Sequence, residues 1–121
     1  MRVIFLDFES KYGKDYTLKK MTPPEYILDA RWETLGCAVI DGVNGEPFWL
    51  DGDAVATWLT NNHVEHAAVC CHNTQFDGSI LSLRYGIYPE AISRHALDGP
   101  RHHRPRPARG QGVAGQCRQV L

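Results

Sequence analysis

The sequence predicts an α/β fold in which a mixed sheet is flanked by helices. Over residues 1–93, short apolar segments rich in Val, Ile and Phe alternate with segments whose apolar residues recur at helical spacing. A turn with two glycines at residues 41–45 separates two strand-like segments, which predicts a hairpin. Hydrophobic residues make up 43% and charged residues 22% of the 121 positions, as is ordinary for one globular domain with its own core.

The periodicity also predicts where the individual elements lie. Four segments are expected to be strands: residues 2–8, 31–40, 46–51 and 65–73. Three segments are expected to be helices: residues 24–30, 52–62 and 74–86. The Pro23-Pro24 pair allows the first helix to begin only at Pro24, Asp53 is placed to cap the second, and Gly86 ends the third. Residues 87–93 lead out of the last helix. Each tryptophan falls in a periodic element and is expected to be core or half-buried: Trp32, Trp49 and Trp58.

Charge is unevenly distributed along the chain. Residues 1–93 carry 13 Asp and Glu against 7 Lys and Arg, whereas residues 94–121 carry six Arg against Asp98 alone. That final segment has no periodicity and lacks Phe, Tyr, Trp and Ile, so it cannot bury enough apolar area to offset the entropy of ordering, and we expect it to be disordered. Neither a long apolar run nor a signal peptide is recognisable, which predicts a cytoplasmic protein with no membrane partner.

Three carboxylates occur in segments that otherwise predict core. Asp7 and Glu9 are two residues apart on the first strand, so both side chains leave the same face. Asp77 lies one turn into the helix that follows the fourth strand. If the first and fourth strands are neighbours, the start of this helix overhangs the first strand and the three acids converge. Such a cluster requires cations, and oxygen-only ligands suit Mg²⁺ or Mn²⁺, two of which can together cleave a phosphodiester.

Other interpretations of these residues stay open at this point. Asp-x-Glu is a common pattern, and an acid such as Asp77 is favoured in the first turn of a helix whether or not it binds a metal. A zinc site is a further hypothesis, because histidines and cysteines crowd one stretch: His63, His66, Cys70, Cys71 and His72. Their placement around a turn and along a single strand argues against a tetrahedral site.

Two stretches carry a family resemblance. "FLDFES" at 5–10 and "HNTQFDGSIL" at 72–81 resemble motifs I and II of the DEDD 3′–5′ exonucleases of the ribonuclease H-like fold. The resemblance covers residues 1–93 and is closest to the proofreading domain of bacteriophage family A DNA polymerases. It implies a ribonuclease H-like sheet that is incomplete at the C-terminus. It also implies two Mg²⁺ or Mn²⁺ ions, held by catalytic residues Asp7, Glu9 and Asp77.

The same resemblance implies a substrate and a partner. The substrate would be a single-stranded DNA 3′ end. RNA stays open as a substrate, because the three acids do not distinguish deoxyribose from ribose. The partner would be a polymerase domain encoded downstream. Phe8, Asn73 and Phe76 are expected to border that 3′ end. The loop after motif I carries Tyr12, Tyr16, Lys14, Lys19 and Lys20, and there tyrosines can stack on bases and lysines can contact phosphates. A solvated loop is the alternative interpretation of those five residues.

Motif III of the family is missing from residues 1–93. It supplies a fourth acid, a few residues after a Tyr or His. The only acid after Glu90 is Asp98, and Gly99 and Pro100 would break a helix there, so we do not expect Asp98 to be that ligand.

The segment after Ser93 departs from the family in a specific way. Family members continue with Asp-Thr-Leu, and a one-base shift in one possible coding sequence for residues 94–101 produces Asp-Thr-Leu-Ser-Met-Ala-Arg. We therefore expect residues 94–121 to be an out-of-frame tail on a truncated domain. Because motif III is missing, we expect that domain to have low activity. The alternatives are a genuine basic tail that binds phosphates, and a catalytically dead or vestigial domain of the same fold.

Overall fold

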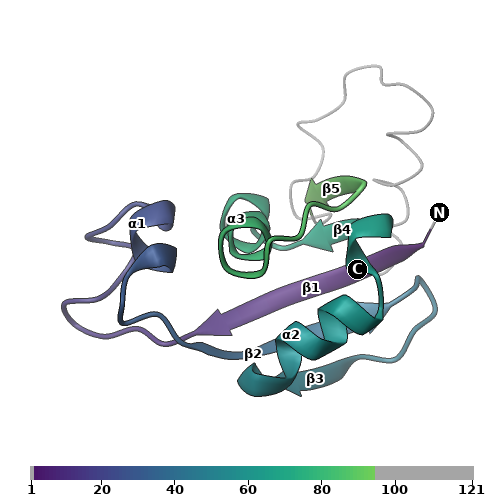
Figure 1. Ribbon diagram of the computed structural model, residues 1–121, viewed down its shortest axis with the longest axis horizontal. Helices are drawn as coiled ribbons and strands as arrows, with labels where there is room; N and C mark the ends of the chain where they lie inside the picture. Colours follow the sequence, from purple (N-terminus) through teal and green to yellow (C-terminus); the bar gives the residue numbers. More distant parts are fainter. Residues whose placement is uncertain (1, 95–121) are drawn as a thin grey trace.

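The computed structural model describes residues 2–94, so the expected tail, apart from Arg94, lies outside the described residues. Within residues 2–94, five strands form one sheet in the order β3-β2-β1-β4-β5 (Figure 1). Their bounds are β1 Val3–Ser10, β2 Thr34–Asp41, β3 Phe48–Asp51, β4 Ala68–Cys71 and β5 Ala91–Arg94. β2 is antiparallel to β1 and β3, whereas β4 is parallel to β1 and β5. The mixed α/β sheet is therefore confirmed, and so is the pairing of the first and fourth strands.

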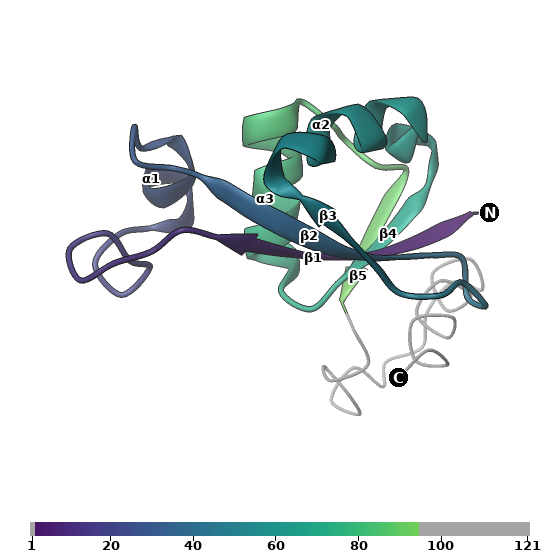
Figure 2. The ribbon, with the colours of Figure 1, turned by 90° about the horizontal axis from the view of Figure 1, so that it is seen from below.

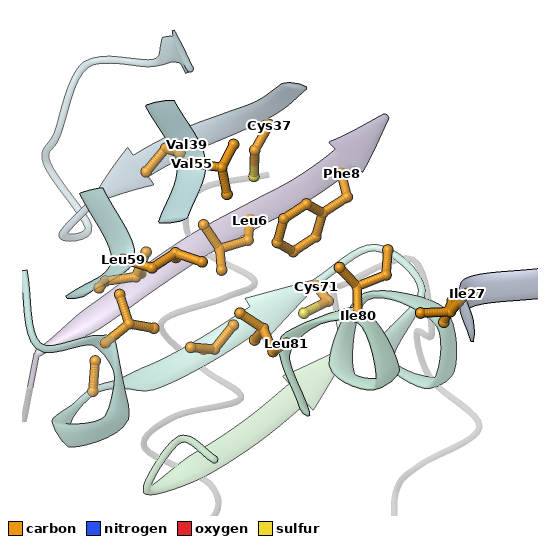
Figure 3. Packing of buried hydrophobic residues seen from close by; sticks show 14 of the residues in the cluster. Leu6, Phe8, Ile27, Cys37, Val39, Val55, Leu59, Cys71, Ile80 and Leu81 are labelled. Atoms are coloured by element: carbon orange, nitrogen blue, oxygen red, sulfur yellow. The ribbon is translucent and has the colours of Figure 1, made fainter. Parts of the chain in front are cut away.

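The helices are α1 Pro23–Leu28, α2 Gly52–Asn61 and α3 Thr74–Tyr85, with a 3₁₀ turn, η1, at Val64–His66. Figure 2 shows α2 on one side of the sheet, which is there seen nearly edge-on. Side chains of α2 and α3 form one buried cluster with alternate residues of β1 and β2 (Figure 3). The labelled members from these four elements are Leu6, Phe8, Cys37, Val39, Val55, Leu59, Ile80 and Leu81. The main core thus lies on one face of the sheet.

The opposite face of the sheet carries a smaller cluster. It consists of Val3, Phe5, Ala68 and Cys70, with Ile40 and Ala91 packed against it. Because side chains alternate along a strand, Asp7 and Glu9 continue this face beyond Phe5. The two acids therefore leave the sheet on the side away from the main core, and both are exposed.

Local capping explains where the predicted helices begin and end. α1 begins at Pro23, one residue earlier than predicted, because Thr22 and Glu25 form a reciprocal capping box ahead of it. The cap of α2 was predicted at Asp53 but is Asp51, and its carboxylate accepts a hydrogen bond from Trp49 Nε1 at 2.9 Å. α3 ends as predicted at Gly86, whose φ of 65° is the left-handed conformation that glycine adopts without strain.

Two predicted segments differ in their boundaries from the structure, and Trp49 is more exposed than predicted. The strand predicted at 65–73 is restricted to Ala68–Cys71, because η1 occupies the preceding residues. The lead-out segment contains β5, in which Arg94 pairs with Cys71, so the sheet extends one residue past the expected domain end. Trp49 is 50% exposed and lies across Gly36, where an added Cβ would be 2.0 Å from the indole.

Within the described residues, no helix is both long enough and apolar enough to cross a membrane.

Candidate metal centre

The candidate centre lies where β1 extends beyond its neighbour β4. The β1–β4 ladder stops at the pair Leu6 and Cys71, after which the chain turns into α3. This leaves the next part of β1 with no strand on that side. Asp77 occupies the gap: its Oδ1 accepts a long hydrogen bond, 3.4 Å, from the backbone N–H of Phe8. Phe8 is the residue between Asp7 and Glu9, so the helix acid meets the strand between the two strand acids.

Asp77 is an unusual buried acid. Its side chain is only 1% exposed, and its Oδ2 has no hydrogen-bond partner among the described residues. A buried carboxylate oxygen without a partner is costly, because a charged group loses its hydration and gains nothing in return. Burial therefore raises the pKa of Asp77 to about 7.

Neighbouring groups act on the same carboxyl in opposite directions. The backbone N–H groups of Phe8 and Asn73 lower the pKa of Asp77, because a hydrogen bond favours the charged form. The charges of Asp7 and Glu9 raise it, which places both strand acids within electrostatic range of the helix acid. The structure thus brings the three acids to one end of β1. However, no three acid, histidine or cysteine side chains of residues 2–94 form a group that could hold a metal ion.

Asn73 holds the start of α3 in place. Its side-chain Oδ1 accepts a hydrogen bond from Phe76 N at 3.2 Å, and its carbonyl accepts one from Asp77 N at 2.8 Å. Asn73 is therefore the N-cap of α3. Through these two bonds the cap determines where the carboxyl group of Asp77 is directed.

The other predicted DNA-contacting residues differ in accessibility. Phe8 is 4% exposed and stacks on Tyr85 with ring centroids 6.1 Å apart, so its side chain belongs to the core and cannot contact DNA directly. Phe76 is half-buried. Tyr12 is 77% exposed, and Lys19 and Lys20 are exposed on the same loop after β1. These last three side chains and the exposed Lys14 remain available to a ligand, whereas the expectation for Tyr16 was wrong, because its ring is 5% exposed and belongs to the core.

An aromatic cluster that the sequence reasoning missed fixes that loop to the body of the domain. Tyr16 stacks on Tyr26 with centroids 4.3 Å apart, and Trp32 and Phe76 contact the ring of Tyr26 at 5.7 and 6.0 Å. The Tyr26 hydroxyl also donates to the carbonyl of Lys11, directly after β1. The only signal in the sequence was a set of aromatic residues without helical or strand periodicity, which did not indicate that they meet.

The donor chemistry of the three acids fits a hard divalent cation. All the donors are carboxylate oxygens, and one of them, Asp77 Oδ2, is buried without a partner. The chain matches no protein-family profile, no curated protein and no solved structure. The functional assignment therefore depends on the geometry of these residues.

Proposed function

We propose that residues 2–94 are part of a ribonuclease H-like 3′–5′ exonuclease domain that hydrolyses single-stranded DNA ends with two Mg²⁺ or Mn²⁺ ions. One observation carries the proposal. Asp77 is buried, contacts the backbone of β1 between Asp7 and Glu9, and keeps one oxygen without a hydrogen-bond partner in the described residues. A cation beside these acids would offset a burial cost that the backbone N–H groups of Phe8 and Asn73 offset only in part.

The topology supports the same proposal. β2 alone runs against the other four strands of the described sheet, and β1 lies at its centre. This is the arrangement expected of a ribonuclease H-like sheet, and it puts the Asp-x-Glu strand beside the strand that leads into the helix with the third acid.

The proposed roles of the residues follow from their positions. Asp7, Glu9 and Asp77 would hold the cations, which supply charge neutralisation at the scissile phosphate and activation of the attacking water. The N–H of Phe8 and the cap by Asn73 hold the Asp77 carboxyl in position.

Substrate contacts are assigned to the exposed residues of the loop after β1. Lys19 and Lys20 would bind backbone phosphates, and Tyr12 would stack on a base. Lys20 is paired with Asp15 at 3.3 Å in the exposed loop, a contact that a phosphate can replace at little cost.

The proposed activity of this chain by itself is low. Residues 2–94 contain no motif III, so the fourth acid of the family and the group that positions water are missing from this part. A non-catalytic domain of the same fold is the second candidate, and the lack of a ready three-ligand group in the described residues favours it. The two candidates differ in turnover, whereas the acids make cation binding possible in both.

Two measurements test the proposal with the full 121-residue chain. Mn²⁺ binding, followed by calorimetry and by the melting temperature, is expected for the wild type and is expected to be lost in Asp7→Asn and Asp77→Asn. Asp53→Asn is the matched control, because Asp53 is an exposed acid in the first turn of a different helix.

Turnover is measured with a 5′-labelled single-stranded oligonucleotide in millimolar Mn²⁺. The nuclease proposal predicts slow, metal-dependent shortening from the 3′ end that Asp7→Asn abolishes. Binding of Mn²⁺ without any shortening would support the non-catalytic domain. The metal centre is refuted if the wild type binds no Mn²⁺. It is also refuted if Asp7→Asn and Asp77→Asn bind Mn²⁺ as the control Asp53→Asn does.

A further inference from the structure

A second candidate site lies where the start of β2 pairs with the end of β1. A depression of about 350 Å³ opens between the start of β2, the first turn of α2 and the last turn of α3. It is lined by Trp32, Glu33, Thr34, Gly52, Arg84 and Tyr85. A Cβ at Gly52 would lie 1.9 Å from the carbonyl oxygen of Thr34, so glycine is what lets α2 approach β2 this closely. The size is at the lower end of the range for small-molecule sites.

The two charged side chains of the depression, Glu33 and Arg84, do not form an ion pair with each other. Glu33 and Arg84 both line it, yet no ion pair joins them, and the Glu33 side chain has no hydrogen bond or ion pair within residues 2–94. Arg84 lies over the indole of Trp32 at 5.7 Å and makes one long hydrogen bond, 3.4 Å, to the carbonyl of Asp29. A carboxylate that only accepts and a guanidinium that only donates thus lie in one depression, where both are exposed and neither is bound to the other.

The hydroxyl groups of Thr34 and Tyr85 add one more hydrogen-bond donor to the depression. Trp32 Nε1 donates to Thr34 Oγ1 at 3.0 Å, and Thr34 Oγ1 and the Tyr85 hydroxyl share a hydrogen bond at 2.9 Å. Whichever hydroxyl donates in that bond, the proton of the other remains without a partner in this chain of contacts. The depression therefore has aromatic walls, one acceptor group and two kinds of donor.

We propose that this depression binds a purine base, with guanine as the best match. Guanine presents two adjacent N–H donors on one edge, which Glu33 can accept. It presents the O6 and N7 acceptors on another, which Arg84 can contact as a pair. The ring system would lie against Trp32 and Tyr85, since every base has a face that stacks on aromatic side chains.

This binding does not depend on the metal chemistry. Tyr85 is eight residues beyond Asp77 on α3, which at the helical rise of about 1.5 Å per residue separates these two residues by about 12 Å along the helix axis. Glu33 and Arg84 make no described contact with the three acids, so guanine recognition is a property of the chain in addition to the proposed hydrolysis.

The test uses the full chain, with EDTA present, titrated with each of the four deoxynucleoside 5′-monophosphates in a calorimeter. The guanine nucleotide is expected to bind most tightly. Glu33→Gln is expected to weaken its binding about tenfold, because the amide can no longer accept two N–H groups, and Arg84→Gln to weaken it by a similar factor. Melting temperatures of the variants are expected to equal that of the wild type, since both side chains are exposed.

Matched controls separate this site from the rest of the molecule. Glu46→Gln and Arg31→Gln change an exposed acid and an exposed arginine outside the depression and are expected to leave guanine-nucleotide binding unchanged. Asp7→Asn is expected to leave it unchanged as well, whatever its effect on Mn²⁺. Equal binding of all four nucleotides, competition by inorganic phosphate alone, or no loss in Glu33→Gln would each overturn the proposal.

Discussion

Replacement of Asp77 by asparagine is expected to stabilise the metal-free protein. Burial raises the pKa of Asp77 from 3.8 to about 7, so the folded protein keeps this proton over a pH range in which the unfolded chain has released it. The favourable contribution to folding is complete below about pH 4 and is lost as the pH rises through about 7. Each pH unit corresponds to about 1.4 kcal/mol, so the loss amounts to roughly 4 kcal/mol.

Asparagine has nearly the same shape and no charge, so its contribution does not change with pH. Its side-chain oxygen can still accept from Phe8 N, as Asp77 Oδ1 does. In urea titrations with EDTA, we expect the free energy of unfolding of Asp77→Asn to exceed that of the wild type by up to roughly 4 kcal/mol at about pH 8. The two proteins should converge at about pH 4.

Mn²⁺ should reverse this difference. A cation that binds only the folded wild type stabilises it by mass action, whereas Asp77→Asn should gain nothing. Asp53→Asn, at an exposed position in the first turn of α2, should change stability by no more than about 0.5 kcal/mol at either pH. The expected effect of the Asp77 charge is refuted if Asp77→Asn is no more stable than the wild type at about pH 8, or if both proteins show the same pH dependence. Either result would mean that burial does not disfavour the charged form of the Asp77 carboxyl group.

Two further substitutions test how the loop and the sheet are held. Tyr26→Phe removes the hydroxyl that donates to the carbonyl of Lys11 and should lower the free energy of unfolding by about 1–2 kcal/mol in urea, whereas no change would mean that water replaces this bond. Gly36→Ala puts a Cβ 2.0 Å from the ring of Trp49 and should cost at least about 1 kcal/mol. Its control is Gly13→Ala, where nothing lies within 4 Å of the added carbon, and an equal loss in both would contradict the close approach at β2.

Local patterns account for much of the fold and part of the candidate site. The placement of Asp7 and Glu9 on one face follows from the two-residue period of a strand, and the C-cap of α3 at Gly86 follows from its residue type. The misassigned cap of α2 has an equally local cause. Asp51 and Asp53 are both suitable residue types, and the sequence does not say at which of them the helical backbone begins.

The sequence by itself determined the periodicity of the elements, the alternation of side chains along β1 and the residue types at the ends of α3, because each depends only on neighbours in the chain. Only the tertiary structure decided that β4 stops beside Leu6, so that Asp77 fills the gap at the edge of β1 and is buried with one unpaired oxygen. The aromatic cluster around Tyr26 and the depression beside Arg84 were decided there too. They join segments far apart in the chain, and a local pattern carries no information about which segments pack together.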